Sequence, residues 1–344
     1  MPDTTRVLIV DDSPSMRRLI RLGIEADPDI QVVAEAGSAR EARDAVNRHS
    51  PDVMTLDVEM PGMDGLEFLR RLMMARPMPV VMISSLTDQG SDAAVRALSL
   101  GAVDCIGKPR FGSANATFKL LADALRIAAK ATVHSMRNCA PPPPSKCNQW
   151  NGKNLLIGAS TGGVEALEAV LSRFPKDCPP TLVTQHMPAQ FLVSFVSRLN
   201  ATTAPSVQLA RDGGALERGT VYIAPGGDTH LTFANGDAGH TCLRPGPKTS
   251  GHRPSVDELF LSAVPWADRS IAVLLTGMGS DGARGMLELR NNGGFCIAQD
   301  KASSVVYGMP RVAAEMGAVD VSLPLSKIAD RALGEATSTG ENVK

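Results

Sequence analysis

Short apolar runs rich in β-branched residues alternate with helix-like stretches along most of this 344-residue chain. In the first part, the predicted strands are residues 6–10, 31–36, 52–58, 79–85 and 102–109. Amphipathic stretches lie between or after them, for example residues 15–26, 39–50 and 118–131. Strands that are joined by helices pair in parallel, because each helix carries the chain back across the sheet. The pattern therefore predicts an α/β fold with a parallel sheet covered on both faces.

The alternation stops at residues 132–152, which have no apolar period and contain four consecutive prolines. Such a run favours an extended polyproline conformation and cannot join a sheet, so this stretch is predicted to be a semi-rigid linker. The linker separates two predicted domains, residues 1–131 and residues 153–344. Each is long enough to bury its own core.

Beyond the linker the strand–helix alternation begins again. The predicted strands are residues 154–158, 181–185, 207–210, 220–225, 271–277 and 295–299. Residues 230–245 carry Asn235-Gly236 between two alternating runs, which is a strong hairpin signal. We therefore expect two doubly wound, mainly parallel α/β domains, the second with a hairpin excursion.

The overall composition is that of an ordinary globular protein. A formal charge of −1 and 4% aromatic residues give no support for a nucleic-acid partner. No apolar run approaches the about 18 residues that span a bilayer, and the start of the chain does not resemble a signal peptide. The six cysteines have no zinc-ligand spacing. We expect a cytoplasmic protein with free thiols and no membrane insertion.

Polar residues stand at the ends of the predicted strands of the first domain. They are Asp11 and Asp12 after the first strand, Asp57 at the end of the third, Ser84 at the end of the fourth and Lys108 at the end of the fifth. In an open parallel sheet these ends meet at one edge, where ligands bind. Three carboxylates there suit Mg²⁺, and a lysine and a hydroxyl suit an incoming phosphoryl group. The alternative is that the aspartates are simply N-caps of the following helices.

The motifs VDDSPSMRRLI, TLDVEMPGMDG, MISS and GKP resemble the receiver domain of two-component response regulators, over about residues 5 to 130. The resemblance implies that Asp57 accepts a phosphoryl group and that Asp11 and Asp12 help Asp57 to hold Mg²⁺. It further implies that Ser84 senses the phosphoryl group and that Lys108 pairs with it.

In the second domain, GASTG at residues 158–162 matches the G-x-S-x-G turn that exposes a nucleophilic serine between a strand and a helix. Ser160 is the candidate nucleophile. A glycine-rich loop at a helix start can also hold phosphate, and a serine there can be a plain helix cap. The loop alone leaves these three interpretations open.

A histidine and an aspartate follow the ends of two other predicted strands. His186 comes directly after residues 181–185, and Asp281 follows residues 271–277. Together with Ser160 they could supply the nucleophile, the general base and the group that orients the base. Nearby glycines let the backbone approach closely, so the amide groups of Met278 and Thr161 are candidates for oxyanion stabilisation.

Rivals exist for two of these roles. His230 is the alternative base, and Asp228 and Asp212 are the alternative acids. The other four histidines, His49, His134, His240 and His252, have no strand-end context. The chain order Ser–His–Asp also differs from that of α/β-hydrolases, so an ordinary member of that group is not expected.

The segments IGASTGG, QHMP, VYIAPGG, HRPSVDELF, LTGMGSDGARGML and SSVVYGMPR resemble the catalytic domain of chemotaxis protein-glutamate methylesterases (CheB type), over about residues 153 to 335. The resemblance implies that Ser160 is the nucleophile, His186 the base and Asp281 its partner. Two departures are visible, Lys301 after QD and the proline-rich linker. The implied folds are a flavodoxin-like receiver and a Rossmann-like catalytic domain.

The same resemblance implies an activity and its partners. The enzyme would hydrolyse glutamate γ-methyl esters on chemoreceptors, would deamidate receptor glutamines, and would be regulated by a chemotaxis histidine kinase. It would need no cofactor for the esterase reaction, and Mg²⁺ for phosphorylation alone. The alternatives from other classes are a receiver-linked nucleotide-binding module and a non-catalytic regulator. The absence of a helix-turn-helix pattern with a basic face argues against a transcriptional regulator.

Overall fold

The computed structural model describes residues 4–60, 63–84, 88–108, 114–133, 149–234 and 236–337. The chain divides into two compact units, residues 1–138 and residues 139–344, called here the receiver unit and the catalytic unit. Most of the predicted linker and Asn235 of the predicted hairpin turn lie outside the described residues. Of the six cysteines, the four described are free thiols. None of the described helices has the length and apolar character needed to cross a membrane.

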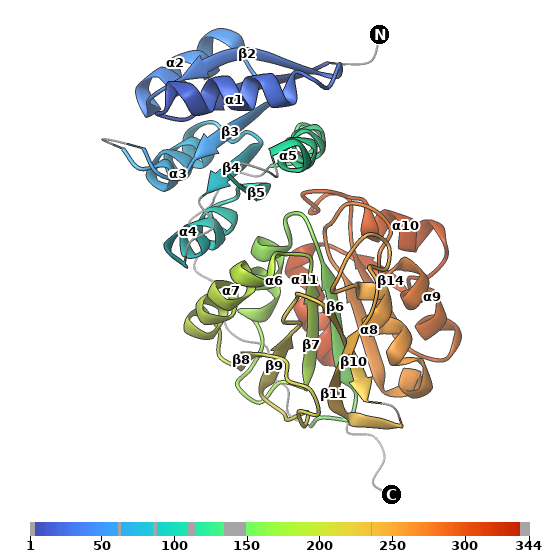
Figure 1. Ribbon diagram of the computed structural model, residues 1–344. Helices are drawn as coiled ribbons and strands as arrows, with labels where there is room; N and C mark the ends of the chain where they lie inside the picture. Colours follow the sequence, from blue (N-terminus) through green and yellow to red (C-terminus); the bar gives the residue numbers. More distant parts are fainter. Residues whose placement is uncertain are drawn as a thin grey trace, which may run out of the picture. The chain divides into compact units, whose positions relative to one another are not determined.

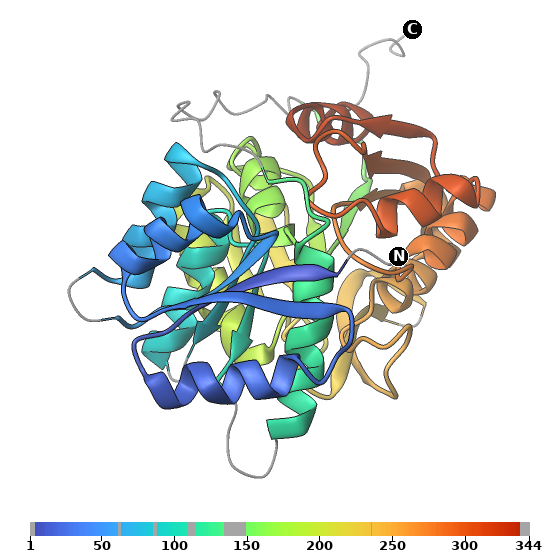
Figure 2. The same cartoon turned by 90° about the horizontal axis from the view of Figure 1, so that it is seen from above.

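The receiver unit is a five-stranded parallel sheet with strand order β2-β1-β3-β4-β5. Its strands are β1 (Thr5–Val10), β2 (Ile30–Ala36), β3 (Val53–Asp57), β4 (Val80–Ser84) and β5 (Asp104–Gly107). Its helices are α1 (Pro14–Ile24), α2 (Ala39–His49), α3 (Gly65–Ala75), α4 (Asp88–Ser99) and α5 (Ala114–Ala128). Helices α1 and α5 pack together on one face, while α3 packs on α4 (Figures 1 and 2). This strand order is that of flavodoxin-like folds, as predicted.

The starts of the receiver helices separate two interpretations of the strand-end aspartates. Helix α1 is capped by Ser13 and helix α3 by Asp64, whose side chains accept bonds from amides of the first turn. Asp11, Asp12 and Asp57 are therefore not the caps of these helices, and the N-cap alternative was wrong for them. Their carboxylates remain available at the carboxyl edge of the sheet.

The catalytic unit is a seven-stranded parallel sheet with strand order β14-β13-β12-β6-β7-β9-β8. Its strands are β6 (Asn154–Ala159), β7 (Thr181–Gln185), β8 (Ser206–Leu209), β9 (Thr220–Ile223), β12 (Ser270–Leu274), β13 (Phe295–Gln299) and β14 (Val321–Leu323). Strand β14 was not predicted, because three partly exposed residues are too few to show a period. The predicted hairpin is confirmed as the antiparallel pair β10 (Thr229–Ala234) and β11 (Asp237–Pro245), which forms a separate sheet.

Helices cover both faces of this sheet, as expected for a doubly wound fold (Figure 1). Helix α6 (Gly163–Leu171) packs on α7 (Ala189–Thr202) and on α11 (Leu325–Glu335). Helix α9 (Ala283–Asn291) packs on α8 (Val256–Ser262) and on α10 (Met309–Glu315), and the short helix η1 (Val264–Arg269) follows α8. The central strands are buried on both faces, so they read as continuous apolar runs rather than as alternating ones.

The strand order of the catalytic unit reverses direction at β6. The chain goes from β6 to its neighbour β7, and it later returns to the other side of β6 with β12. Such a switch point opens a crevice at the carboxyl ends of the strands, where ligands bind in open α/β sheets. The residues that follow β6, β7 and β12 therefore meet at one place.

Candidate active site and phosphoacceptor pocket

In the receiver unit, the five predicted polar residues lie at the ends of adjacent strands. Asp11 and Asp12 follow β1, Asp57 and Ser84 are the last residues of β3 and β4, and Lys108 follows β5. The amide of Lys108 donates to the carbonyl oxygen of Ser84 at 2.8 Å. The Nζ atom of Lys108 lies 2.8 Å from Oδ2 of Asp57 and 3.7 Å from Oδ2 of Asp11. The structure therefore brings the acids, the lysine and the end of β4 together.

Three carboxylates of this pocket could hold a metal ion. One oxygen each from Asp11, Asp12 and Asp57 lies within 4.8 Å of the others. The Oδ2 atom of Asp11 is buried and has no hydrogen-bond partner within the described part of the chain. A buried oxygen of this kind fits the ligand set of a hard cation such as Mg²⁺.

Burial dominates the electrostatics of the pocket. It raises the pKa of Asp57 and that of Asp11 above the usual value, and the nearby Lys108 offsets this only in part. Burial acts to lower the pKa of Lys108, but the bond to Asp57 and the negative charges of Asp57, Asp11 and Glu59 together outweigh burial, and the net pKa is raised. The pocket thus holds acids whose ionised forms need a cation, with one lysine already bound to Asp57.

In the catalytic unit, Ser160 follows β6 and is 9% exposed. Its amide donates to the carbonyl of Thr276 at 3.0 Å, which joins the end of β6 to the segment after β12. The side-chain amide of Gln185 donates to the carbonyl oxygens of both Ser160 and His186, at 3.0 Å each. One amide group therefore holds the Ser160 loop beside the histidine segment.

Steric crowding around Ser160 leaves no room for a Cβ at two glycine positions. Gly162 is the N-cap of α6 with φ +75°, and a Cβ there would lie 2.6 Å from Cβ of Val305. At Gly277, a Cβ would lie 2.7 Å from Cβ of Ser160. The loop and the segment after β12 thus approach more closely than side chains allow.

The imidazole of His186 has two different edges. Its Nε2 atom lies 2.8 Å from Oδ2 of Asp281, and the side chain is 6% exposed. Its Nδ1 atom is buried and has no hydrogen-bond partner among the described residues. A carboxylate at Nε2 favours a proton on that nitrogen, which leaves the lone pair on Nδ1 to act as a base.

The carboxylate of Asp281 accepts three further hydrogen bonds from the start of α8. The donors are Oγ of Ser255 at 2.7 Å, the amide of Val256 at 2.7 Å and the amide of Asp257 at 3.0 Å. Burial acts to raise the pKa of Asp281, but the bonds from His186, Ser255 and Asp257 outweigh it and the net pKa is lowered. Asp281 is thus a helix cap as well as the partner of His186, and it stays ionised.

The rival residues lie in other arrangements. His230 accepts the amide proton of Ser255 at Nδ1 (3.1 Å), and its Nε2 lies 2.9 Å from the carbonyl of Pro247, so both ring nitrogens are occupied. Asp228 pairs with Arg253 at the surface, and Asp212 accepts the amide of Leu243. Neither acid contacts His186, whose carboxylate partner is Asp281.

Thr161 directly follows Ser160, and Met278 follows Gly277, where an added Cβ would lie 2.7 Å from Cβ of Ser160. Neither backbone amide donates a hydrogen bond to another described residue, and the side chain of Met278 is 48% exposed. Free amides beside a serine suit the stabilisation of an oxyanion.

Comparison with known proteins agrees with this geometry. The family model described as CheB methylesterase matches residues 155–332, and the response regulator receiver domain model matches residues 7–115. A protein-glutamate methylesterase/protein-glutamine glutaminase of Agrobacterium fabrum is 49% identical over 99% of both chains. One from Caulobacter vibrioides is 50% identical over 97% of this chain and 98% of its own.

This chain belongs to the CheB methylesterase family. The crystal structure of the Thermotoga maritima CheB methylesterase catalytic domain is 39% identical, with a TM-score of 0.51 over 54% of this chain and 98% of that one. The chain is therefore a hydrolase of the CheB methylesterase family joined to a receiver domain.

Two residues of the CheB-type site were missed from the sequence. Ser255 binds Asp281, and its spacing from Glu258 is that of a capping box, which could have revealed a helix start there. His252, which follows no predicted strand, stacks on His186 with ring centroids 3.7 Å apart. No periodicity in the sequence signals that contact.

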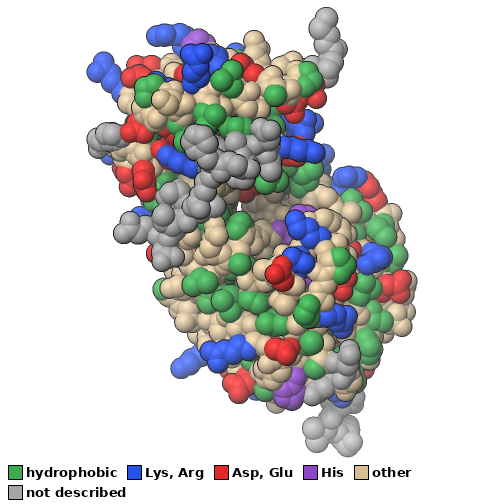
Figure 3. All heavy atoms as spheres, in the orientation of Figure 1, with side chains coloured by type: hydrophobic (Ala, Val, Ile, Leu, Met, Phe, Trp, Pro, Cys, Tyr) green, Lys and Arg blue, Asp and Glu red, His purple; other side chains and the backbone are tan. Residues whose placement is uncertain are grey.

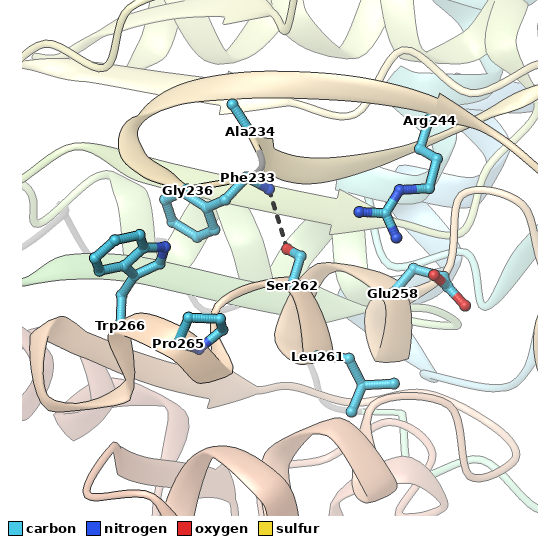
Figure 4. A pocket seen from close by; sticks show the side chains of 9 residues that line it. All are labelled: Phe233, Ala234, Gly236, Arg244, Glu258, Leu261, Ser262, Pro265 and Trp266. Carbon is cyan, nitrogen blue, oxygen red and sulfur yellow. Dashed lines mark hydrogen bonds between the residues drawn. The ribbon is translucent and has the colours of Figure 1, made fainter.

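A pocket of about 360 Å³ lies between the hairpin and the α8–η1 segment (Figure 4). Its lining includes Phe233 and Trp266 on one side and Arg244 and Glu258 on the other. None of the three proposed catalytic side chains lines it. This pocket is therefore separate from the CheB-type site.

Proposed function

We propose that this chain hydrolyses glutamate γ-methyl esters on chemoreceptors to glutamate and methanol, and that it deamidates receptor glutamines by the same route. The relatives named above are protein-glutamate methylesterases and protein-glutamine glutaminases. The observation that carries the proposal is the imidazole of His186, which is bonded to Asp281 at Nε2 and has a buried Nδ1 without a described partner, on a segment that Gln185 joins to the Ser160 loop. The expected location is the cytoplasm, where the receptor segments would be accessible.

The reaction proceeds in two halves. Nδ1 of His186 takes the proton of the Ser160 hydroxyl as the oxygen bonds to the ester carbonyl carbon, and the Thr161 and Met278 amides stabilise the oxyanion. The C–O bond to methoxide breaks as His186 returns the proton, so methanol leaves and an acyl-serine forms. Water then attacks the acyl-serine through the same base, which releases glutamate and restores Ser160. For a glutamine, the C–N bond breaks and ammonia leaves.

Charges near the site favour an acidic substrate segment. Histidine side chains reach the surface of the catalytic unit beside a group of Lys and Arg side chains (Figure 3). The positive charge of Lys248 is close enough to His252 to act to lower its pKa, and the positive charge of Arg284 acts to lower the pKa of Asp257. Receptor segments that carry several glutamates would be attracted to such a surface.

The receiver unit is proposed to regulate this reaction. A carboxylate oxygen of Asp57 would attack the phosphorus of a phosphodonor such as a histidine kinase, and the bond from phosphorus to the donor would break. Asp11, Asp12 and Asp57 would hold Mg²⁺, which supplies positive charge to the phosphoryl oxygens. Lys108, now on Asp57, would pair with the phosphoryl group, and the hydroxyl of Ser84, at the end of β4, would donate a hydrogen bond to a phosphoryl oxygen.

The proposal is tested with receptor membranes that carry glutamate methyl esters. We expect the full chain to release methanol in a one-to-one ratio with new glutamate side chains, and to release ammonia from receptors that carry glutamine. Chromatography and peptide mass spectrometry measure the products. Receptors that keep all their methyl esters after incubation with folded, phosphodonor-treated protein would contradict the proposal.

Regulation is tested separately with a small phosphodonor and magnesium. The wild-type rate of methanol release is expected to change on addition of the phosphodonor, and the rate of Asp57→Asn is expected to stay constant. An Asp57→Asn chain that responds as the wild type does would exclude Asp57 as the phosphoacceptor.

A further inference from the structure

The imidazole of His186 is held on two sides. Its Nε2 edge contacts Asp281, and one ring face is covered by His252. The two rings are nearly parallel, with an interplanar angle of 6° and a centroid separation of 3.7 Å. The ring of His252 makes no hydrogen bond to another described residue, so the stack is its principal contact with the site.

A tight turn presents His252 to the site. The amide of His252 donates to the carbonyl of Thr249 at 2.9 Å, and the amide of Thr249 donates back at 3.0 Å. Between them, Ser250 and Gly251 have φ of +52° and +82°, which gives a sharp reversal. The residue at the end of the turn therefore has a defined direction.

The turn is anchored on the same helix start that binds Asp281. Oγ1 of Thr249 donates to Glu258 at 2.9 Å, and Oγ of Ser250 lies 3.3 Å from Oδ2 of Asp257. The amides of Val256 and Asp257 meanwhile hold the carboxylate of Asp281. The first turn of α8 therefore fixes both groups that contact the imidazole of His186.

A single hydrogen bond does not define the orientation of an imidazole. The terminal torsion of histidine has broad wells, so a ring bonded at one nitrogen can still tilt about that bond. A tilt of the His186 ring would change the direction of Nδ1, the atom proposed to take the proton of Ser160, and misplacement by about 1 Å can lower a rate about a hundredfold. A parallel ring on one face prevents this tilt.

We propose that His252 is a positioning residue, which holds the ring of His186 in the plane that directs Nε2 to Asp281 and Nδ1 to Ser160. This inference rests on the proposed function. It assigns His252 no proton transfer, because its role is to pack an aromatic face against the ring that does the transfer.

The charge state of His252 suits this role. The pKa of His252 is lowered to about 4, chiefly by burial; the neighbouring His186 and Lys248 act in the same direction, and Asp281 opposes them. His252 is therefore neutral near neutral pH. A neutral ring can face the imidazolium that His186 becomes during the reaction, whereas a charged ring would repel it.

The test compares His252→Phe with His252→Ala in the full chain. Phenylalanine keeps a flat aromatic face, and alanine removes it. We expect His252→Phe to keep kcat within about threefold of wild type, and His252→Ala to lower kcat by at least about tenfold with KM nearly unchanged. Equal loss of kcat in both variants, or a wild-type kcat in His252→Ala, would overturn the proposal.

A second readout needs no substrate. Nitrogen-15 NMR of chain labelled in its histidines reports the tautomer of His186. We expect a fixed Nε2–H form in wild type and His252→Phe, and a mixture of ring states in His252→Ala. An unchanged His186 spectrum in His252→Ala would refute the positioning role even if the esterase function itself failed. Thermal melting of each variant confirms that it is folded.

Discussion

At the scale of the residue, the chemistry of the site follows from the two nitrogens of His186. Nε2 faces the ionised Asp281, and Nδ1 is buried without a partner in the described structure. This arrangement favours the tautomer with its proton on Nε2, and the lone pair on Nδ1 is the base that we propose. This assignment reverses the use of the two nitrogens that serine proteases of the chymotrypsin type show.

An Asp281→Asn substitution tests that assignment. The amide can donate to Nε2, which would place the proton of His186 on Nδ1 and remove the base. We expect kcat for methanol release to fall by about 10³–10⁴-fold, by analogy with the corresponding change in serine proteases. Retention of more than a tenth of the wild-type kcat in a folded variant would argue against Nδ1 as the base.

The effect of Asp11 on the stability of the folded receiver unit depends on pH. Burial raises its folded-state pKa above the unfolded value of about 4, so the folded state binds the proton more strongly. The protonated carboxyl of Asp11 therefore stabilises the folded state. This stabilisation is fully present below the unfolded pKa and is lost as pH rises through the folded pKa. We expect Asp11→Asn to raise the melting temperature of the receiver unit at pH 7 by about 2–5 °C, without added metal.

The control for Asp11→Asn is the same comparison at lower pH. The gain in melting temperature should shrink as pH approaches 4, because the wild-type carboxyl is then protonated. An equal rise in melting temperature at pH 7 and pH 4.5, or a fall at pH 7, would show that the ionised carboxylate of Asp11 does not destabilise the folded state.

At the scale of the element, the N-termini of α8 and α9 are joined by reciprocal hydrogen bonds. Asp281, just before α9, accepts the first amides of α8, and Asp257, in the first turn of α8, accepts the amide of Gly285 in α9 at 2.8 Å. Each helix thus caps the other across the site. The reciprocal caps join the position of Asp281 to the packing of both helices.

Loss of one cap should therefore affect both stability and catalysis. We expect Asp257→Ala to destabilise the catalytic unit by about 1–2 kcal/mol, and to lower kcat because Asp281 loses its fixed position. Denaturant unfolding and methanol release measure the two effects. Asp268→Ala is the matched control, since Asp268 is exposed and has no described hydrogen bond. A kcat for Asp257→Ala equal to that of this control would argue against the coupling.

Much of the fold could be predicted from local patterns, because strands buried on both faces and amphipathic helices leave a period in the sequence. Ser160, His186 and Asp281 could be placed together because each follows a strand and parallel strands end at one edge. The roles of Ser255 and His252 could not, because they depend on how α8 packs against residues far away in the chain. The three residues of β14 pair at the sheet edge and show no pattern of their own.

At the scale of the whole molecule, the phosphoacceptor pocket and the hydrolase site belong to separate compact units. The three residues proposed for the esterase reaction, Ser160, His186 and Asp281, all lie in the second unit. We therefore expect residues 149–344, expressed alone, to release methanol at a rate that a phosphodonor does not change. The full chain is the control, and its rate should respond to the phosphodonor. A fragment that is folded but inactive would show that the receiver unit contributes to the catalytic machinery.

The central claim is that the hydroxyl of Ser160, at the edge where β6, β7 and β12 end, attacks the ester. The most direct measurement is the rate of methanol release by Ser160→Ala and by wild type, at equal concentrations of folded chain. Removal of the nucleophile should lower the rate by at least about 10³-fold without changing the melting temperature by more than a few degrees. A Ser160→Ala chain that releases methanol at the wild-type rate would contradict the account.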